Sequence, residues 1–160
     1  MNRPQRRAAI AVIALVVAGL AALVLAGAAG SQQVLVVTDD EGETVQSIPV
    51  EGNATVVLEY THSVEKTTVR DIYVVREEGL AMTRMEFRSY GAGLPARADV
   101  EITDDGTFIY ELPADDPSPL HVATGEIAGH ELIVDGDRYD LVDLADGGTV
   151  TLTVETTRGL

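Results

Sequence analysis

The sequence predicts an all-β domain, folded as an antiparallel β-sandwich or a barrel-like sheet, after one N-terminal transmembrane helix. Three observations predict this architecture. Residues 8–29 contain no polar side chain, the residues after them form many short runs rich in Val, Ile, Thr and Tyr, and Gly, Asp and Pro separate those runs. Short β-rich runs at close spacing are typical of sandwiches and barrels. We therefore expect an anchor over residues 1–30 and one extracytoplasmic β domain over residues 31–160.

The apolar segment is long enough to cross a bilayer. A helix of twenty-two residues spans roughly 33 Å, and the hydrocarbon core of a bilayer is about 30 Å thick. Arg3, Arg6 and Arg7 precede the segment, and the next basic residue is Lys66. Because positive charge stays on the cytoplasmic side, we expect a single-pass protein of the cell membrane with a cytoplasmic N-terminus and an extracytoplasmic C-terminal domain.

A cleaved signal peptide is the alternative interpretation of this segment. Ala26-Gly27-Ala28 resembles a signal-peptidase site. The apolar core of a signal peptide is usually about 7 to 15 residues long, however, so the length favours a retained anchor that contacts lipid through residues 8–29. Under either interpretation the rest of the chain is exported.

The exported part is expected to fold into ten strands joined by tight turns. The last strand is the clearest, because Val150, Leu152 and Val154 alternate with threonines and so share one face of a sheet. Asp135-Gly136 is the strongest hairpin signal. The expected strands are 34–38, 44–50, 55–62, 68–76, 80–88, 107–112, 120–124, 131–134, 138–144 and 149–155.

The charge balance excludes one class of partner and suggests an environment. The chain has a net charge of −15, and the part after Ser31 contains eight basic and twenty-six acidic residues, a net charge of −18. Nucleic acid is excluded as a partner, because binding phosphates needs a basic face. At about 1 M salt the Debye length falls to roughly 3 Å, which screens such self-repulsion. We interpret the domain as halophilic; an acidic surface that binds cations or a basic partner is the alternative.

Two stretches differ from ordinary strand and turn sequence. The first, Tyr60-Thr61-His62-Ser63-Val64-Glu65-Lys66, gathers a phenol, an imidazole, a carboxylate and the only lysine where a strand ends. The second, Ser89-Tyr90-Gly91-Ala92-Gly93-Leu94-Pro95, is a Gly-x-Gly segment closed by proline, whose amides could form an anion-binding nest. The alternative is purely structural: a half-buried, hydrogen-bonded His62, core tyrosines and a chain bend. The candidate ligand- or partner-binding residues are Tyr60, His62, Ser63, Glu65, Lys66, Asp71, Gly91, Gly93 and Pro95.

Catalysis and metal binding have weaker support in the sequence. His62 and Ser63 are adjacent, so on an extended strand they would face opposite sides, and no G-x-S-x-G motif is present. We therefore expect no enzyme activity, no catalytic residue and no cofactor. His62, Glu65 and Asp71 could hold a cation if the turn folds back, but their spacing does not match a known metal motif, so metal binding stays open.

The sequence also contains one candidate glycosylation site and no cysteine. Asn53-Ala54-Thr55 is an N-glycosylation sequon on the exported side. The chain has no cysteine, which excludes both disulfides and lipid attachment through a thiol.

The two stretches, together with the acidic Asp71 that follows the first, resemble the signature of the DUF1850 family, a domain of unknown function in small bacterial and archaeal proteins. Members often carry an N-terminal anchor. Their genes are commonly found beside tripartite (TRAP) transporters that use TAXI solute-binding proteins, and members often have glutamate where this chain has Asp71. The high acidity is that of a haloarchaeal-like member. The resemblance implies an accessory role in transport and brings no established activity.

The leading hypothesis is therefore a membrane-anchored extracytoplasmic accessory protein of a TAXI-type TRAP transporter. It would act by binding a ligand, the transporter's membrane subunit or the solute-binding protein. The alternative is a stand-alone sensor domain that binds a small molecule or a cation.

Overall fold

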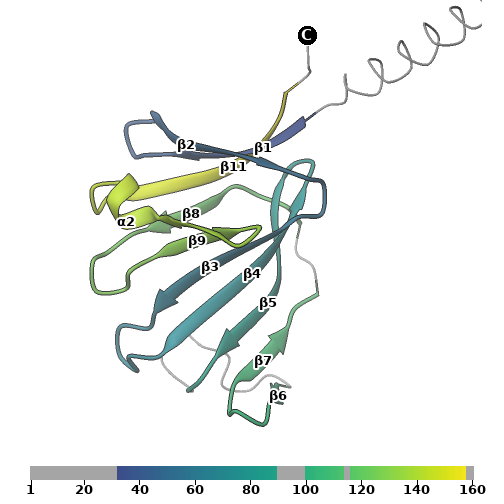
Figure 1. Ribbon diagram of the computed structural model, residues 1–160, viewed down its shortest axis with the longest axis vertical. Coiled ribbons are helices and arrows are strands. Elements are labelled where there is room, and N and C mark those ends of the chain that lie inside the picture. The colour runs from purple at the N-terminus through teal and green to yellow at the C-terminus, as the bar shows by residue number, and fades with distance from the viewer. Residues whose placement is uncertain (1–31, 90–99, 114–115, 158–160) are drawn as a thin grey trace, which may run out of the picture. The chain divides into compact units, whose positions relative to one another are not determined.

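The computed structural model describes residues 32–89, 100–113 and 116–157 of the chain, and these residues are almost entirely β (Figure 1). The prediction of an antiparallel β domain is confirmed. The expected anchor lies outside the described residues, and no helix within them is both long enough and apolar enough to span a membrane. The elements are β1 (Gln32–Thr38), β2 (Thr44–Val50), β3 (Thr55–Thr61), β4 (Thr68–Arg76), β5 (Gly79–Phe87), β6 (Glu101–Ile102), β7 (Phe108–Glu111), β8 (Leu120–Ala123), β9 (Glu131–Val134), β10 (Asp137–Asp140), α2 (Leu141–Leu144) and β11 (Thr149–Thr157).

The strands form two sheets. A four-stranded sheet has the order β2-β1-β11-β8, and a seven-stranded sheet has the order β10-β9-β3-β4-β5-β7-β6. In Figure 1, β3, β4 and β5 of the larger sheet extend below the smaller sheet, with β8 at the edge of the smaller sheet. The smaller sheet therefore covers only part of the larger one.

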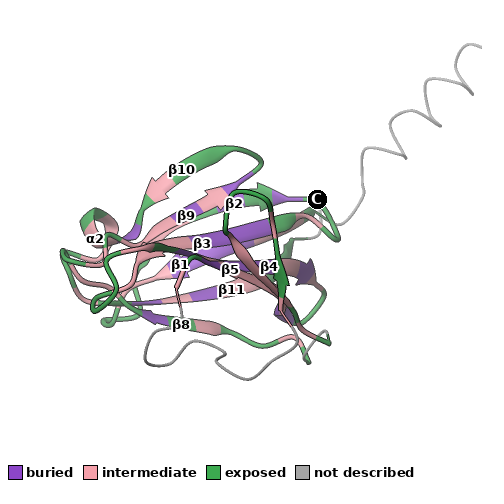
Figure 2. Ribbon diagram, turned by 90° about the horizontal axis from the view of Figure 1, so that it is seen from below, coloured by how far each residue is buried: buried purple, intermediate pink, exposed green. Residues whose placement is uncertain are grey.

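The main core lies between the two sheets. Side chains alternate along a strand, so β1 and β11 each turn one row of aliphatic residues toward the matching row of β3 and β9. This core includes the fully buried Leu35, Val37, Leu132, Val150 and Leu152. Figure 2 shows buried segments in strands of both sheets.

A second, smaller apolar cluster continues along the larger sheet. It is built on the buried Val69 of β4 and Phe87 of β5, whose ring stacks on Phe108 of β7 at 5.4 Å between centroids. Tyr60 packs against both clusters. The end of β3 is thus the place where the two apolar regions meet.

Turn chemistry confirms the expected hairpin between β9 and β10. Asp135 and Gly136 both have positive φ, 52° and 91°, as the tightest hairpin turns require. Asp137 pairs with Val134 directly across the turn.

Seven of the ten predicted strands have different boundaries in the structure, and two of these differences have a clear physical cause. The strand predicted over 138–144 ends at Asp140, whose carboxylate accepts hydrogen bonds from the backbone N–H groups of Val142 and Asp143 and so begins the short helix α2. The strand predicted to end at His62 ends at Thr61, because the His62 amide already donates to the carbonyl of Thr67 across the turn. Strand β6, which has only two residues, was not predicted.

Candidate functional site

A single carboxylate is buried among the described residues, and it belongs to Asp71. Asp71 lies near the middle of β4, opposite Leu58 of β3 and Met85 of β5. Directly opposed residues of antiparallel strands share a face, so the Asp71 side chain lies on the inner face, with the core residue Leu58. Its exposed fraction is 8%. Burial of a carboxylate costs free energy unless polar partners compensate.

Two tyrosines surround this carboxylate. The Tyr60 hydroxyl donates a hydrogen bond to Asp71. Burial raises the pKa of Asp71 to about 6, and the Tyr60 hydrogen bond opposes that rise only in part. Burial, and secondarily the charge of Asp71, raises the pKa of Tyr60 to about 12 and that of Tyr73 further. At neutral pH a mostly ionised Asp71 therefore lies beside two protonated phenols.

An open groove runs past these residues between the larger sheet and the edge strand β8. It has a volume of about 370 Å³. One wall consists of Leu58, Tyr60, Asp71 and Tyr73, and the other of β8 residues 120–123. His130 also lines the groove, and its ring stacks on Tyr60 with 5.3 Å between centroids and 28° between planes.

Two buried polar atoms at this groove have no hydrogen-bond partner within the described part of the chain. They are Oδ1 of Asp71 and Nδ1 of His130. Burial lowers the pKa of His130, so the imidazole is neutral at pH 7. Buried polar atoms without partners are rare in folded proteins. The groove therefore offers unused hydrogen-bonding capacity beside a negative charge.

The β3–β4 turn holds most of the remaining predicted residues. His62 organises the turn: its Nδ1 accepts from the Glu65 amide at 3.2 Å, and its carbonyl accepts from the Lys66 amide at 2.9 Å. Lys66 has a positive φ of 55°. Ser63, Glu65 and Lys66 are exposed, whereas His62 is half-buried. The structural interpretation of His62 thus accounts for its position, and the side chains beside it remain available at the surface.

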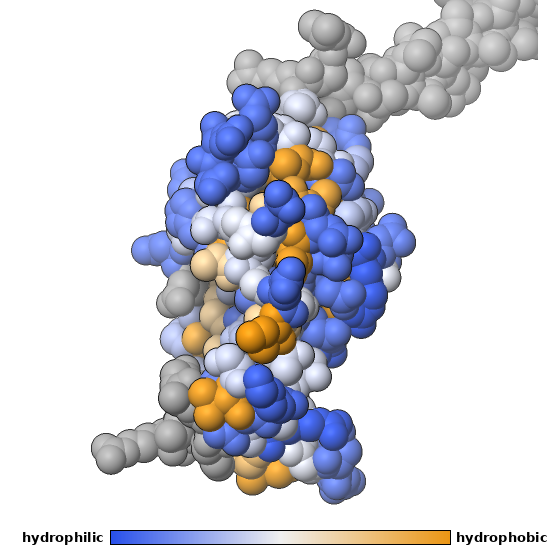
Figure 3. Space-filling view, turned by 90° about the vertical axis from the view of Figure 1, so that its left-hand side faces the viewer, coloured by the Kyte–Doolittle hydropathy of each residue, from blue (hydrophilic) through white to orange (hydrophobic). Residues whose placement is uncertain are grey.

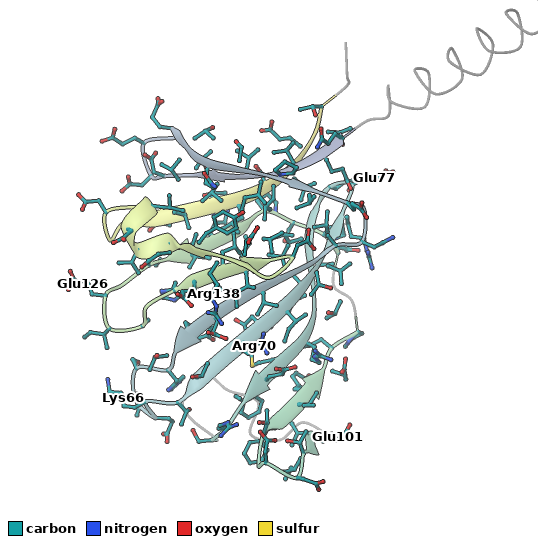
Figure 4. The ribbon with its side chains drawn as sticks, viewed as in Figure 1. Lys66, Arg70, Glu77, Glu101, Glu126 and Arg138 are labelled. Carbon is teal, nitrogen blue, oxygen red and sulfur yellow. The ribbon has the colours of Figure 1, made fainter. Side chains whose placement is uncertain are left out.

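Lys66 belongs to a different depression from Asp71. This second depression, of about 550 Å³, is lined by Lys66, Thr67, Thr68, Arg70, Glu86, Phe87, Arg88, Asp105 and Thr107. Arg70 neighbours Asp71 in β4, so the two side chains point to opposite faces of the sheet. Figure 4 shows Lys66 at the β3–β4 turn and Arg70 on the sheet. Lys66 and Asp71 therefore line different depressions.

A chain of ion pairs crosses the outer face of the larger sheet. Glu59 of β3 pairs with Arg70 at 3.2 Å and with Arg138 of β10 at 2.9 Å, and Arg70 also pairs with Glu86 of β5 at 3.3 Å. Arg138 also pairs with Glu131, and Arg84 pairs with Glu86 and with Glu111. Arg70 and Arg138 are labelled in Figure 4. Each arginine of this chain of ion pairs therefore has a carboxylate partner within the folded domain.

The structure brings together only some of the predicted site residues. Tyr60 and Asp71 meet at the groove, and His62, Ser63, Glu65 and Lys66 share the turn. Gly91, Gly93 and Pro95 lie outside the described residues. Ser89, the last described residue before that stretch, is hydrogen-bonded to Thr67 at 3.3 Å. Ser89, where the second motif begins, therefore lies beside Thr67, the residue that follows the first motif.

The structure also places the sequon residue Asn53 and the three residues considered as cation ligands. Asn53 is exposed in the turn between β2 and β3, with a φ of 70°, and its side-chain oxygen accepts from Arg76. Among the described residues no group of three or more His, Asp and Glu side chains is arranged to hold a metal ion. The sequence-based triad of His62, Glu65 and Asp71 is thus not assembled, since Asp71 lies on the inner face of β4.

Tyr73 and His130 line the groove and were not predicted as site residues. Tyr73 had a usable signal, because it lies two residues after Asp71 on the same strand and so on the same face. His130 had none, because it follows a loop, and only the packing of that loop against the end of β3 places its ring on Tyr60. The loop is held there by the Thr61 amide, which donates to the carbonyl of Ala128 at 2.7 Å.

Comparison with protein families identifies the domain. The family model described as "Domain of unknown function (DUF1850)" matches residues 56–141, more than half of the chain. The chain belongs to this family. Neither the comparison with curated proteins nor the comparison with solved structures gave a match. All residues that line the groove fall within the DUF1850 region, whereas β1, β2 and β11 lie outside it.

Proposed function

We propose that this DUF1850 protein is a membrane-anchored extracytoplasmic binding protein that assists a TAXI-type TRAP solute transporter. The observation that carries the binding role is the groove at Asp71, where a buried carboxylate keeps one oxygen without a partner among the described residues. The groove lies wholly inside the family region, so it belongs to the part of the chain that defines the family. The role in transport is supported by the resemblance of the two sequence motifs.

The N-terminal segment supports the cellular placement. Residues 8–29 are apolar and follow three arginines. On this proposal the segment is a single-pass helix that holds the β-sandwich on the outer side of the membrane, and Asn53 is exposed on that side. The net charge of −15 supports a salt-rich environment. The face in Figure 3 is mainly hydrophilic, with a narrow line of apolar residues.

The exposed β3–β4 turn is the proposed contact surface for the transporter. Ser63, Glu65 and Lys66 project from it, and Val64 has an exposed fraction of 67%. On this proposal Val64 lies at the centre of the contact, and the charged and hydroxyl groups beside it form the polar rim. Because His62 holds the turn through its Nδ1 and carbonyl, the shape of this surface depends on the imidazole.

Copurification tests the proposal. We would tag the full chain at its C-terminus, extract native membranes with mild detergent and identify captured proteins. The expected result is capture of the TRAP membrane subunit or the TAXI solute-binding protein, with less capture by the Lys66→Ala variant. Glu101→Gln is the matched control, because Glu101 is also exposed and lies on β6. Recovery of the chain without either transporter component would contradict the transport role.

A stand-alone sensor is the second candidate, and the groove favours it equally. A sensor would bind its ligand and be stabilised by it without a transporter component. Stabilisation by a ligand follows from mass action, so a ligand-dependent shift of the melting temperature, together with failure to capture any transporter component, would support sensing.

A further inference from the structure

The groove at Asp71 has an unbalanced charge. Arg70 and Arg84, the basic residues closest to it in the sheet, lie on the outer face and pair with Glu59, Glu86 and Glu111. Among the described residues, the side chain that acts on the Asp71 carboxylate through a hydrogen bond is Tyr60, a neutral donor. A buried charge is normally paired. The fold therefore leaves a place at this carboxylate for a positive group.

The hydrogen-bonding groups of the groove favour a ligand that donates. Asp71 accepts through Oδ1, and an ionised carboxylate cannot donate. The Tyr60 hydroxyl uses its one proton in the hydrogen bond to Asp71, so toward a ligand it acts as a hydrogen-bond acceptor. A carboxylate or phosphate ligand would meet the Asp71 charge with no described cation to offset it. An ammonium group supplies three N–H donors and one positive charge.

The walls of the groove favour an organic cation over a metal ion. The aromatic rings of Tyr60 and Tyr73 and the imidazole of His130 line one side, and Leu58, Leu120 and Val122 supply aliphatic surface. Cations are attracted to the faces of aromatic rings. Calcium takes six to eight oxygen ligands, and among the described residues Asp71 is the only carboxylate that lines the groove.

We propose that this groove binds a small organic ammonium ligand. The Asp71 carboxylate accepts an N–H of the ammonium group, the ring of Tyr60 or Tyr73 contacts its charge, and the aliphatic wall at β8 contacts its carbon chain. This inference rests on the proposed binding role and names its ligand class. It also excludes the groove as a binding place for an anionic solute.

The test uses n-butylammonium chloride with the full chain in a neutral detergent at constant ionic strength. The chain has no tryptophan and five tyrosines, so tyrosine fluorescence reports on a groove that contains two of them. We expect saturable binding of n-butylammonium, and neither n-butanol nor butyrate should produce the same saturation curve. Equal responses to the amine and the alcohol would overturn the proposal, as would stronger binding of butyrate.

Variants test the role of the carboxylate. Asp71→Asn keeps the side-chain shape and removes the charge, and we expect affinity for n-butylammonium to fall at least tenfold. Asp137→Asn is the matched control, because it removes one exposed carboxylate at the β9–β10 hairpin, away from the groove. Unchanged affinity in Asp71→Asn would overturn the proposal. Circular dichroism of each variant establishes that it is folded.

The wild-type chain provides a second test if Asp71→Asn fails to fold. Within the described part of the chain, the titratable groups that line the groove with Asp71 are Tyr60, Tyr73, His130 and His121, and the His121 ring is hydrogen-bonded to Thr151. The two phenols stay neutral between pH 5 and 8, and His130 is already neutral at pH 7. Affinity should therefore fall roughly tenfold per pH unit below the pKa of Asp71, about 6. Affinity that does not change between pH 5 and 8 would contradict the proposal.

Different results would contradict the accessory role in transport and the binding of an ammonium ligand. If n-butylammonium does not bind while the transporter components are captured, the ligand class is wrong and the accessory role stands. If the amine binds and no transporter component is captured, the groove assignment stands and the accessory role is wrong.

Discussion

The buried carboxylate should give the folding stability of this domain a pH dependence of unusual sign. Most native carboxylates stabilise a fold as they ionise, because they are paired. Asp71 is different, because burial raises its pKa from 3.8 to about 6. Between these two values the folded state holds a proton that the unfolded state has lost. The contribution of Asp71 to stability is therefore most favourable below about pH 4, falls as the pH rises through 6, and is constant above that.

The size of the effect follows from the shift. A difference of about 2 pKa units corresponds to about 3 kcal/mol, and the 8% exposed fraction of Asp71 means that solvent screens little of it. Asp71→Asn removes this titration and leaves all other carboxylates in place. We expect the difference in free energy of unfolding between wild type and variant to change by about 2 to 3 kcal/mol between pH 4 and 7.5, in favour of the variant at high pH.

Urea unfolding of the full chain in detergent, followed by tyrosine fluorescence at several pH values, measures this difference. Asp137→Asn serves as the control, because it removes the same charge from an exposed position of β10. Its curve should stay parallel to that of the wild type. If the curves of wild type and Asp71→Asn are also parallel, Asp71 does not titrate abnormally and the description of the groove is wrong.

Four further outcomes are expected. Tyr60→Phe removes the hydrogen bond that lowers the pKa of Asp71, so the pH at which stability is lost should move upward, with a cost of about 1 to 2 kcal/mol at pH 8; NMR titration and urea unfolding would measure the two effects. Gly79→Ala should destabilise the fold by more than about 2 kcal/mol, because φ is 145° and a Cβ would lie 2.7 Å from the Ser118 backbone; a melting temperature within a degree of wild type would contradict this. His62→Ala should impair transport in cells while circular dichroism still shows a folded domain; a variant that does not fold would make the histidine purely structural. The wild-type domain should lose stability when salt is lowered from molar to millimolar concentration, and equal melting temperatures in the two buffers would remove the halophilic interpretation.

The strands could be predicted because their signals are local. Alternation of Val150, Leu152 and Val154 with threonines assigns a face to each side chain without knowledge of any partner strand. The Asp135-Gly136 turn could be predicted for the same reason, because its two positive φ values are a property of those residues. The helix after Asp140 was missed because a strand pattern and a capped turn compete over the same few residues, and the burial of Leu141 in the core helps to decide between them.

The candidate site was only half predictable. Tyr60 and Asp71 were recognised as unusual, but eleven positions separate them in the sequence, and the antiparallel pairing of β3 with β4 is what places Tyr60 opposite Val69, two residues before Asp71. Lys66 and Asp71 are both candidate binding residues in the sequence, but they line different depressions, because the strand directs Asp71 to the inner face while Lys66 lies beside Arg70.

The sequence by itself determined the strand content, the tight turns, the apolar N-terminal segment and the acidity, because each depends on residue type and short-range periodicity. Only the tertiary structure decided that Asp71 is buried with no cation from the described residues beside it, that the His130 ring stacks on Tyr60, and that the edge strand β8 forms the far wall of the groove. The physical reason is that burial and charge balance depend on which distant segments pack together, and this is set by the pairing of strands across the two sheets.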